Sequence, residues 1–181
     1  MNAPRLFLIA VLSLVAAASA QQPAPSPQAP QTPPAPPPPA CESPEFRQFD
    51  FWLGSWTVTD PKDQTIGSSE ISRISDGCAV REQWQSSQGA TGTSLNYYDK
   101  ADGSWHQVWV GGGGMILHLK GGLQNGAMVM TGGDRQTPRG TVRDRIRWTP
   151  QPDGAVLQEW EISTDGGKTW QSSFSGRYRK R

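Results

Sequence analysis

A regular alternation of apolar and polar side chains limits the fold of this chain more than any other feature. The clearest run, 141–148, places four residues on one face, Val142, Asp144, Ile146 and Trp148, and a threonine and three arginines on the other. Successive side chains of a β-strand point to opposite faces of the sheet, so this period of two residues predicts a strand with one buried face. The runs 154–163 and 168–178 repeat the pattern. We therefore expect antiparallel β-structure.

Seven weaker runs of the same kind precede these three. They cover 55–59, 68–74, 79–85, 92–98, 104–110, 115–120 and 127–131. The intervening segments, including Gly-Gly-Asp at 132–134, are rich in residues typical of hairpin turns. We predict an all-β fold, an antiparallel up-and-down β-barrel of about ten strands, because closure removes exposed sheet edges. A β-sandwich is the alternative. A short helical turn at 43–49 should precede the first strand and plug one end of the barrel.

Composition separates two short segments from this domain. Residues 1–20 combine Arg5, an apolar run at 6–18 and small residues before position 21, which predicts a secretory signal peptide. The apolar run is too short for a membrane span, so no membrane insertion is expected. Residues 21–40 contain only Pro, Ala, Gln, Ser and Thr and predict a disordered, extended linker. The barrel domain should cover 41–181 and be exported, either to the periplasm or into the medium.

The domain contains two cysteines, Cys41 and Cys78. An even number of cysteines in an exported protein favours a disulfide bond. The alternative is a reactive thiol or metal pair. Only His106 and His118 are available as further ligands, and no spacing fits a zinc site, so no metal site is predicted. Closing the loop between the cysteines should stabilise the fold by roughly 4 kcal/mol.

The charges of the chain nearly cancel. It carries 17 lysines and arginines and 16 aspartates and glutamates, a formal net charge of +1. The bulk electrostatics of a nucleic-acid binder are therefore absent, and no nucleic-acid partner is predicted. Basic residues cluster at 139–147 and 177–181, where we expect solvated strand faces and a frayed end.

The start of the domain carries a resemblance. Phe-Asp-Phe-Trp-Leu-Gly-Ser-Trp at 49–56 resembles the opening of calycin-type proteins, in which a helical turn leads through Gly-x-Trp into the first strand. The segments 92–99, 105–110 and 145–150 look like an exported bacterial family related to the domain of unknown function 1579. The resemblance covers nearly all of 43–180. It implies a lipocalin-like or nitrobindin-like barrel and no established activity.

Two details of such a barrel can be compared with the residues present. Trp56 should pack under the barrel floor, with a guanidinium of the last strand, Arg177 or Arg179, over its ring. Nitrobindin-like barrels hold haem through a histidine near the C-terminus, and no histidine follows His118. No cofactor is therefore predicted, and both histidines are expected on the outer surface.

The segment 163–170, Ser-Thr-Asp-Gly-Gly-Lys-Thr-Trp, matches the Asp-box of sialidase propellers. There is one copy, whereas a propeller needs a repeat in every blade. We therefore interpret it as a hairpin turn in which the aspartate binds turn amides, the glycines supply positive φ angles and the tryptophan packs beneath.

Two acidic residues lie among apolar neighbours. Glu82 alternates with a valine and a tryptophan, and Asp144 with a valine and an isoleucine. An inward carboxyl in an aromatic lumen should have a raised pKa and could take part in acid–base chemistry. The alternative is a satisfied network in which the carboxylate pairs with an inward arginine or glutamine. The chain has no nucleophile elbow, zinc-protease motif or phosphate-binding loop.

Five tryptophans share strand faces with glutamines and Glu82, namely Trp84, Trp105, Trp109, Trp160 and Trp170. Such a stripe either lines a ligand cavity or fills the lumen. We expect a cavity for a small, largely apolar or aromatic ligand, lined by Glu82, Trp84, Gln107, Trp109, Asp144, Gln158 and Trp160. The rival hypotheses are a small hydrolase or isomerase using Glu82 or Asp144, and a filled barrel with a structural role in the cell envelope.

Overall fold

The computed structural model describes residues 41–181. The predicted signal peptide and linker, residues 1–20 and 21–40, lie outside the described residues. Two 3-10 helices, η1 (Pro44–Arg47) and η2 (Asp50–Trp52), precede the first strand, and a third, η3 (Ser75–Gly77), connects two strands. The strands are β1 (Gly54–Thr59), β2 (Thr65–Ile74), β3 (Ala79–Ser86), β4 (Thr91–Asp99), β5 (Ser104–Gly111), β6 (Ile116–Gln124), β7 (Ala127–Thr137), β8 (Gly140–Pro150), β9 (Val156–Ser163) and β10 (Gln171–Lys180).

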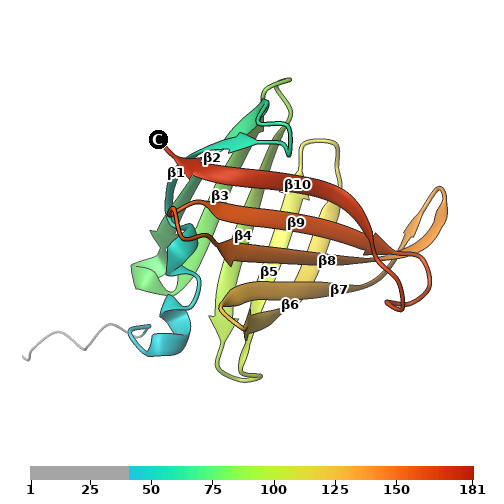
Figure 1. Cartoon of the computed structure of the whole chain (residues 1–181). Helices are drawn as coiled ribbons and strands as arrows, with labels where there is room; N and C mark the ends of the chain where they lie inside the picture. Colours follow the sequence, from blue (N-terminus) through green and yellow to red (C-terminus); the bar gives the residue numbers. More distant parts are fainter. Residues whose placement is uncertain (1–40) are drawn as a thin grey trace, which may run out of the picture. The chain divides into compact units, whose positions relative to one another are not determined.

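The ten strands form one closed barrel (Figure 1). Each strand pairs antiparallel with its neighbour in sequence, and β1 pairs with β10 to close the ring. The prediction of an all-β, ten-stranded, antiparallel up-and-down barrel is therefore confirmed. Closure leaves no strand at a free sheet edge along the ring.

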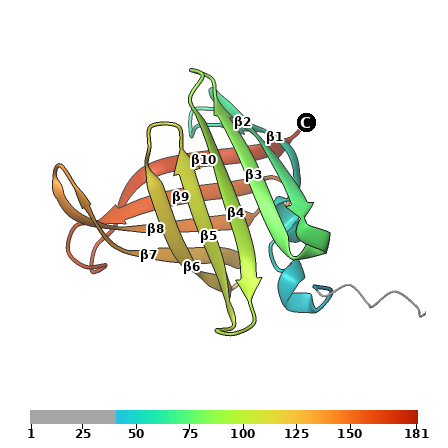
Figure 2. The same ribbon diagram turned by 180° about the vertical axis from the view of Figure 1, so that it is seen from behind.

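The two N-terminal 3-10 helices lie at one end of the barrel, and the β7–β8 hairpin and β9–β10 turn lie at the opposite end (Figures 1 and 2). Phe49 and Trp52 are fully buried, and their rings stack with centroids 4.9 Å apart. Phe49 also meets Trp105 and Trp148 edge-on, at 5.7 and 5.2 Å. The helical segment therefore plugs this end, as the sequence predicted, and aromatic rings fill this half of the lumen.

Trp56 is fully buried in this plugged half, and its Nε1 donates to the carbonyl of Trp52 at 2.9 Å. The prediction that Arg177 or Arg179 covers its ring is wrong. Lys180 stands directly opposite Trp56 in the β1–β10 register, and its Nζ lies 5.0 Å from the ring centroid. The two arginines instead pair with aspartates in nearby turns.

The predicted disulfide between Cys41 and Cys78 is confirmed. It links Cys41, three residues before the start of η1, to Cys78, the residue directly before β3. Arg73 supports the same region, because its Nη1 donates to the carbonyls of Phe46 and Gly77. The plug segment is thus attached to the barrel by one covalent bond and by these hydrogen bonds.

Two arginines of the basic stretch 139–147 lie in cross-strand ion pairs. Arg145 bonds Glu161 across β8 and β9, and Arg143 bonds Asp134 across β7 and β8. Each partner carries the opposite charge on a neighbouring strand, so the charges of these two arginines are compensated where they lie. None of the helices in residues 41–181 has the length and hydrophobicity that a membrane span needs.

Candidate ligand-binding cavity

A cavity of about 130 Å³ lies inside the barrel. Its lining is Glu82, Trp84, Gln107, Trp109, Leu117, Ile146, Gln158, Trp160, Phe174 and Tyr178. Six of the seven residues predicted from strand parity are in this set. The seventh, Asp144, is fully buried nearby and lines a different hollow. Alternation along separate strands thus places distant residues around one space.

The cavity occupies the half of the barrel away from the plug. Trp84 and Trp109 come from the last residues of β3 and β5, and Trp160 faces Phe174 across β9 and β10. The tryptophans are therefore divided between two roles. Those of the plugged half fill the lumen and are fully buried, namely Trp52, Trp56, Trp105 and Trp148. The cavity tryptophans, Trp84, Trp109 and Trp160, are half-buried.

Trp170 does not belong to the inward stripe. The β9–β10 register shifts between Ser172 and Phe174, so side chains before this bulge are displaced to the other face. The Trp170 ring consequently lies under the guanidinium of Arg145, 4.1 Å from its carbon, on the outside of the barrel. An alternation of side chains that is continued without a break through this bulge assigns Trp170 to the inward face, which is wrong.

Gly92 on β4 makes room for an aromatic wall. A Cβ atom at this position would overlap the six-membered ring of Trp109. On β2, a Cβ at Gly67 would lie 2.6 Å from Trp84 Cη2, so the same device repeats two strands away. Because these glycines have no side chains, the large rings can lie against the barrel wall, and the centre of the lumen stays open.

We expect Gly92→Ala to lower the free energy of unfolding by about 2 kcal/mol, because the added methyl group forces the Trp109 ring to move. Gly122→Ala on β6 is the matched control, since nothing lies within 4 Å of its Cβ position. Its stability should change by less than about 0.5 kcal/mol. Urea unfolding of both variants measures the difference, and equal stabilities would show that Gly92 is not needed for space.

Glu82 forms the polar floor of the cavity. Its side chain is 3 % exposed and accepts hydrogen bonds from Ser94 Oγ at 3.0 Å and Ser69 Oγ at 3.2 Å. Burial raises the pKa of Glu82 to about 7, although hydrogen bonds from Ser94, Ser69 and Tyr178 act in the opposite direction. Burial and the neighbouring Glu82 also raise the pKa of Tyr178 well above its usual value. Near neutral pH the Glu82 carboxyl is thus divided between its two protonation states.

A chain of amides fixes the polar side of the cavity next to Glu82. Asn96 Nδ2 donates to the Val80 carbonyl at 3.1 Å, which determines how its amide is turned. Its Oδ1 then accepts from Gln107 Nε2 at 2.7 Å. Gln107 Oε1 is consequently the acceptor that remains, and no hydrogen bond to it is formed by residues 41–181. Sequence reasoning placed Gln107 in the lumen but missed Asn96.

Gln158 contributes a second unused acceptor. Its Oε1 atom is buried and has no hydrogen-bond donor among the described residues. A buried carbonyl without a donor costs about 1–3 kcal/mol, so it is a position where a bound molecule gains by donating a hydrogen bond. Gln158 lines the cavity beside Trp160. Gln158 Oε1 is therefore a buried acceptor of this cavity that lacks a donor in this part of the chain.

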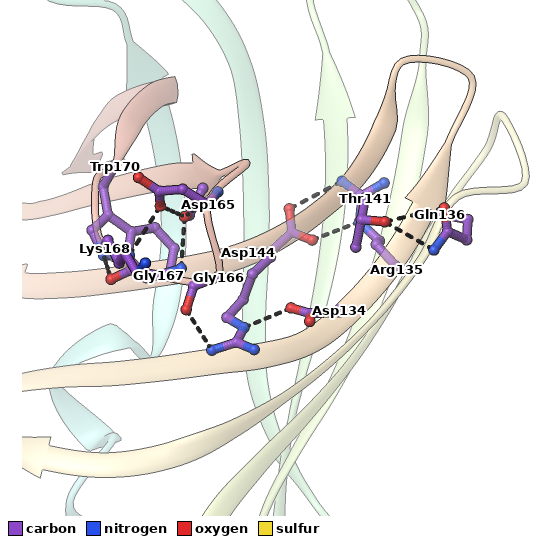
Figure 3. Close-up of polar contacts among 12 residues, drawn as sticks. Asp134, Arg135, Gln136, Thr141, Asp144, Asp165, Gly166, Gly167, Lys168 and Trp170 are labelled. Atoms are coloured by element: carbon purple, nitrogen blue, oxygen red, sulfur yellow. Dashed lines mark hydrogen bonds and ion pairs between the residues drawn. The ribbon is translucent and has the colours of Figure 1, made fainter.

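Asp144 lies in a salt bridge at the base of the β7–β8 hairpin (Figure 3). Arg135 Nε and Nη2 donate to its two oxygens at 2.5 and 3.0 Å, and Trp160 Nε1 donates at 2.8 Å. The carboxylate is thus satisfied, in accord with the network alternative. The prediction that Asp144 lines the ligand cavity is wrong, because Arg135 draws it toward the wall.

The hollow beside Asp144 lies where two strands separate. The ladder between β6 and β7 ends at the pair Leu119–Gly132, and β6 begins three residues earlier. A space of about 180 Å³ results, lined by Ile116, Leu117, His118, Leu119, Gly132, Gly133, Asp134, Arg135 and Asp144. His118 is exposed on the outer face, as expected, and His106 is paired with Asp102 outside the barrel.

We expect Arg135→Ala to lower the free energy of unfolding by about 2 kcal/mol, because it leaves a buried carboxylate without its charged donor. Arg143→Ala is the control. Arg143 pairs with Asp134, whose side chain is 49 % exposed, so its loss should change stability by less than about 1 kcal/mol. Urea unfolding compares them, and an equal loss in both variants would contradict the structural role of the Arg135–Asp144 pair.

The Asp-box segment forms the β9–β10 turn (Figure 3). Asp165 accepts hydrogen bonds from the backbone amides of Lys168 and Thr169, and these bonds, with that of the Thr169 hydroxyl, hold its pKa well below the usual range. Gly166 and Gly167 have φ angles of 74° and 94°, and Trp170 Nε1 donates to the Gly167 carbonyl. The hairpin interpretation is therefore confirmed.

Four cavity residues were missed from the sequence, Leu117, Ile146, Phe174 and Tyr178. Each lies on the inward face of its strand, so parity contained the necessary signal for all four. Two hydroxyl donors to Glu82, Ser69 and Ser94, were also missed. Short polar side chains on an inward face carry no hydrophobic signal. Only the strand register reveals them, because Ser94 stands opposite Glu82 and Ser69 stands opposite Trp84, two residues further along β3.

These features define a closed antiparallel barrel with a half-filled lumen and an aromatic, acceptor-rich cavity. No protein-family model matches the chain, and no curated protein matches it.

Proposed function

We propose that this protein is an exported, calycin-like barrel that binds a small apolar or aromatic molecule in its lumen. The observation that carries the proposal is the cavity of about 130 Å³ between Trp84, Trp109, Trp160 and Phe174. Apolar walls with a few placed polar groups are typical of ligand sites. The Gly-x-Trp opening and the segments similar to the family related to domain of unknown function 1579 support the calycin-like assignment.

The size of the cavity restricts the ligand. A cavity of about 150 Å³ lined by apolar residues holds one benzene ring, whereas pockets for drug-sized ligands measure about 300–1,000 Å³. The ligand is thus a single-ring molecule, or a longer molecule that buries one ring. This is smaller than the ligands of wide-mouthed barrels.

The disulfide supports export. Disulfide bonds persist in oxidising compartments and are rare in the cytosol. The Cys41–Cys78 bond and the signal-like composition of residues 1–20 agree with a periplasmic or secreted location.

Ethylbenzene titration tests the binding proposal. Three of the eight tryptophans line the cavity, so binding should change the intensity or the emission maximum of tryptophan fluorescence. Ile146→Phe adds a ring inside the cavity and should abolish this change. Leu95→Phe is the matched control, because Leu95 is 41 % exposed on the outer face, and it should bind as the parent does. Absence of any spectral or calorimetric response would refute the proposal.

The acid–base alternative rests on Glu82. A carboxyl group with a pKa near the working pH, in an aromatic cavity, is suited to proton transfer, so a small hydrolase or isomerase is the second candidate. Asp144 is a weaker choice, because Arg135 and Trp160 occupy its oxygens. Turnover of any substrate found for the protein should disappear in Glu82→Gln with folding intact. Retained turnover would exclude Glu82 as the catalytic group.

A further inference from the structure

Glu82 is a buried acid without a basic partner. The lining of the cavity contains no lysine, arginine or histidine. Among residues 41–181, none of the ion pairs includes Glu82. Buried charges in proteins are normally paired, because an unpaired charge loses its hydration. A positive charge is therefore the missing element of this site.

The groups that surround Glu82 are neutral hydroxyls. Ser69 faces it from β2, Ser94 from β4 and Tyr178 from β10. Tyr178 is the other titratable group of the cavity lining. A carboxylate offers about four lone-pair positions, and the hydrogen bonds from Ser69 and Ser94 leave room for a ligand.

The walls also favour a cation. The faces of tryptophan and phenylalanine rings carry partial negative charge and attract ammonium groups within about 6 Å. The cavity presents four such rings, those of Trp84, Trp109, Trp160 and Phe174. The bond from Trp160 Nε1 to Asp144 restrains one ring in its position.

Two amide oxygens that lack a donor within residues 41–181 lie in the same cavity. Gln158 Oε1 is buried without a donor, and the Asn96 bond leaves Gln107 with its oxygen free. An anionic ligand would meet these oxygens and Glu82 unfavourably. A ligand with N–H groups supplies what each of them lacks.

We propose that the cavity selects a small aromatic or apolar amine, bound as its cation with the ammonium group toward Glu82 and Gln158. This inference rests on the proposed function, because it names the chemical class of the ligand for the same cavity. Amine and ring are recognised by different parts of the site, the acceptors of the floor and the aromatic walls.

Three nearly isosteric probes, benzylamine, benzyl alcohol and ethylbenzene, test this by isothermal titration calorimetry at pH 6 and pH 8. Benzylamine should bind most tightly at pH 8. Its affinity should fall about tenfold at pH 6, because a carboxyl with a pKa of about 7 loses about nine-tenths of its charge over that range, whereas an alkylamine stays protonated. Ethylbenzene should bind equally at both pH values.

Glu82→Gln should remove both the preference for benzylamine and its pH dependence, while ethylbenzene still binds. Circular dichroism checks the fold, and the pH dependence of the parent protein decides if the variant does not fold. Binding of ethylbenzene without tighter binding of benzylamine at pH 8 would overturn the amine inference and leave the proposed function standing. Failure of all three probes would overturn both.

Discussion

Replacing Cys41 and Cys78 together by alanine should lower the free energy of unfolding by about 4 kcal/mol, the largest single effect we expect. The disulfide closes a loop with a sequence separation of 37 residues, which holds the plug, β1, β2 and η3. Without it, the unfolded chain gains the freedom that loop closure removes. Because the helical plug packs on Trp105 and Trp148, its loss should also expose the filled half of the barrel.

Urea unfolding of the parent protein with and without a reducing agent measures this effect. Reduction should shift the parent midpoint to that of the Cys41→Ala/Cys78→Ala variant, and the variant should not respond to the reducing agent. A parent protein whose unfolding midpoint is insensitive to reduction, with both thiols shown to be free, would contradict the prediction.

The strand pattern was predictable because one face of every strand is buried. Alternation along β3 and β5 correctly placed Glu82, Trp84 and Trp109 at one cavity although the two strands are separate in sequence. The run of sequential hairpins and the removal of exposed edges favoured a closed barrel over a β-sandwich, and the closed barrel is what forms. Local chemistry, a two-residue period ended by turn residues, is sufficient for this level of structure.

Glycine pairs inside strands were the main source of error. Gly-Gly-Asp at 132–134 looks like a turn, but β7 continues through it as a β-bulge to Thr137. This extension is what brings Arg135 to Asp144, so the partner of Asp144 was not predictable from the assumed strand end. The true β7–β8 turn contains Pro138 and Arg139. Glycine signals a turn and a bulge equally well, and only pairing with β8 decides between them.

Strand register and side-chain size account for the other differences between the expected and the observed structure. Lys180, rather than Arg177 or Arg179, covers Trp56 because the register of β1 against β10 sets which residue stands opposite. Register between the first and last strands depends on closure of the whole barrel. The volume that remains inside also depends on how far each ring extends, as at Gly92 and Trp109. No short-range pattern contains that information.

The stability of the protein should fall by about 2.5 kcal/mol between pH 5 and pH 8 through Glu82 alone. Its pKa is about 7 in the folded protein and 4.5 without its environment, so the folded state binds more protons over this range. A group with a raised carboxyl pKa favours folding at low pH, and this contribution is lost as pH rises through about 7. Stability depends on pH in this way because burial penalises the charged form of Glu82, and that form has no basic partner at high pH.

Glu82→Gln isolates this contribution, because the amide keeps the shape of the protonated carboxyl and does not titrate. The variant should match the parent protein in urea unfolding at pH 5 and be more stable by about 2.5 kcal/mol at pH 8. Ser94→Ala removes a hydrogen bond that lowers the pKa of Glu82, so the loss of stability should continue to a higher pH and become larger in total. A difference between Glu82→Gln and the parent that stays constant with pH would mean that Glu82 is already charged in the fold. Addition of benzylamine at pH 8 should restore part of the lost stability in the parent and none in Glu82→Gln, because a ligand that binds only the folded state stabilises it by an amount that rises with the logarithm of ligand concentration over Kd. The unpaired acid thus links the stability of the barrel to occupation of its cavity.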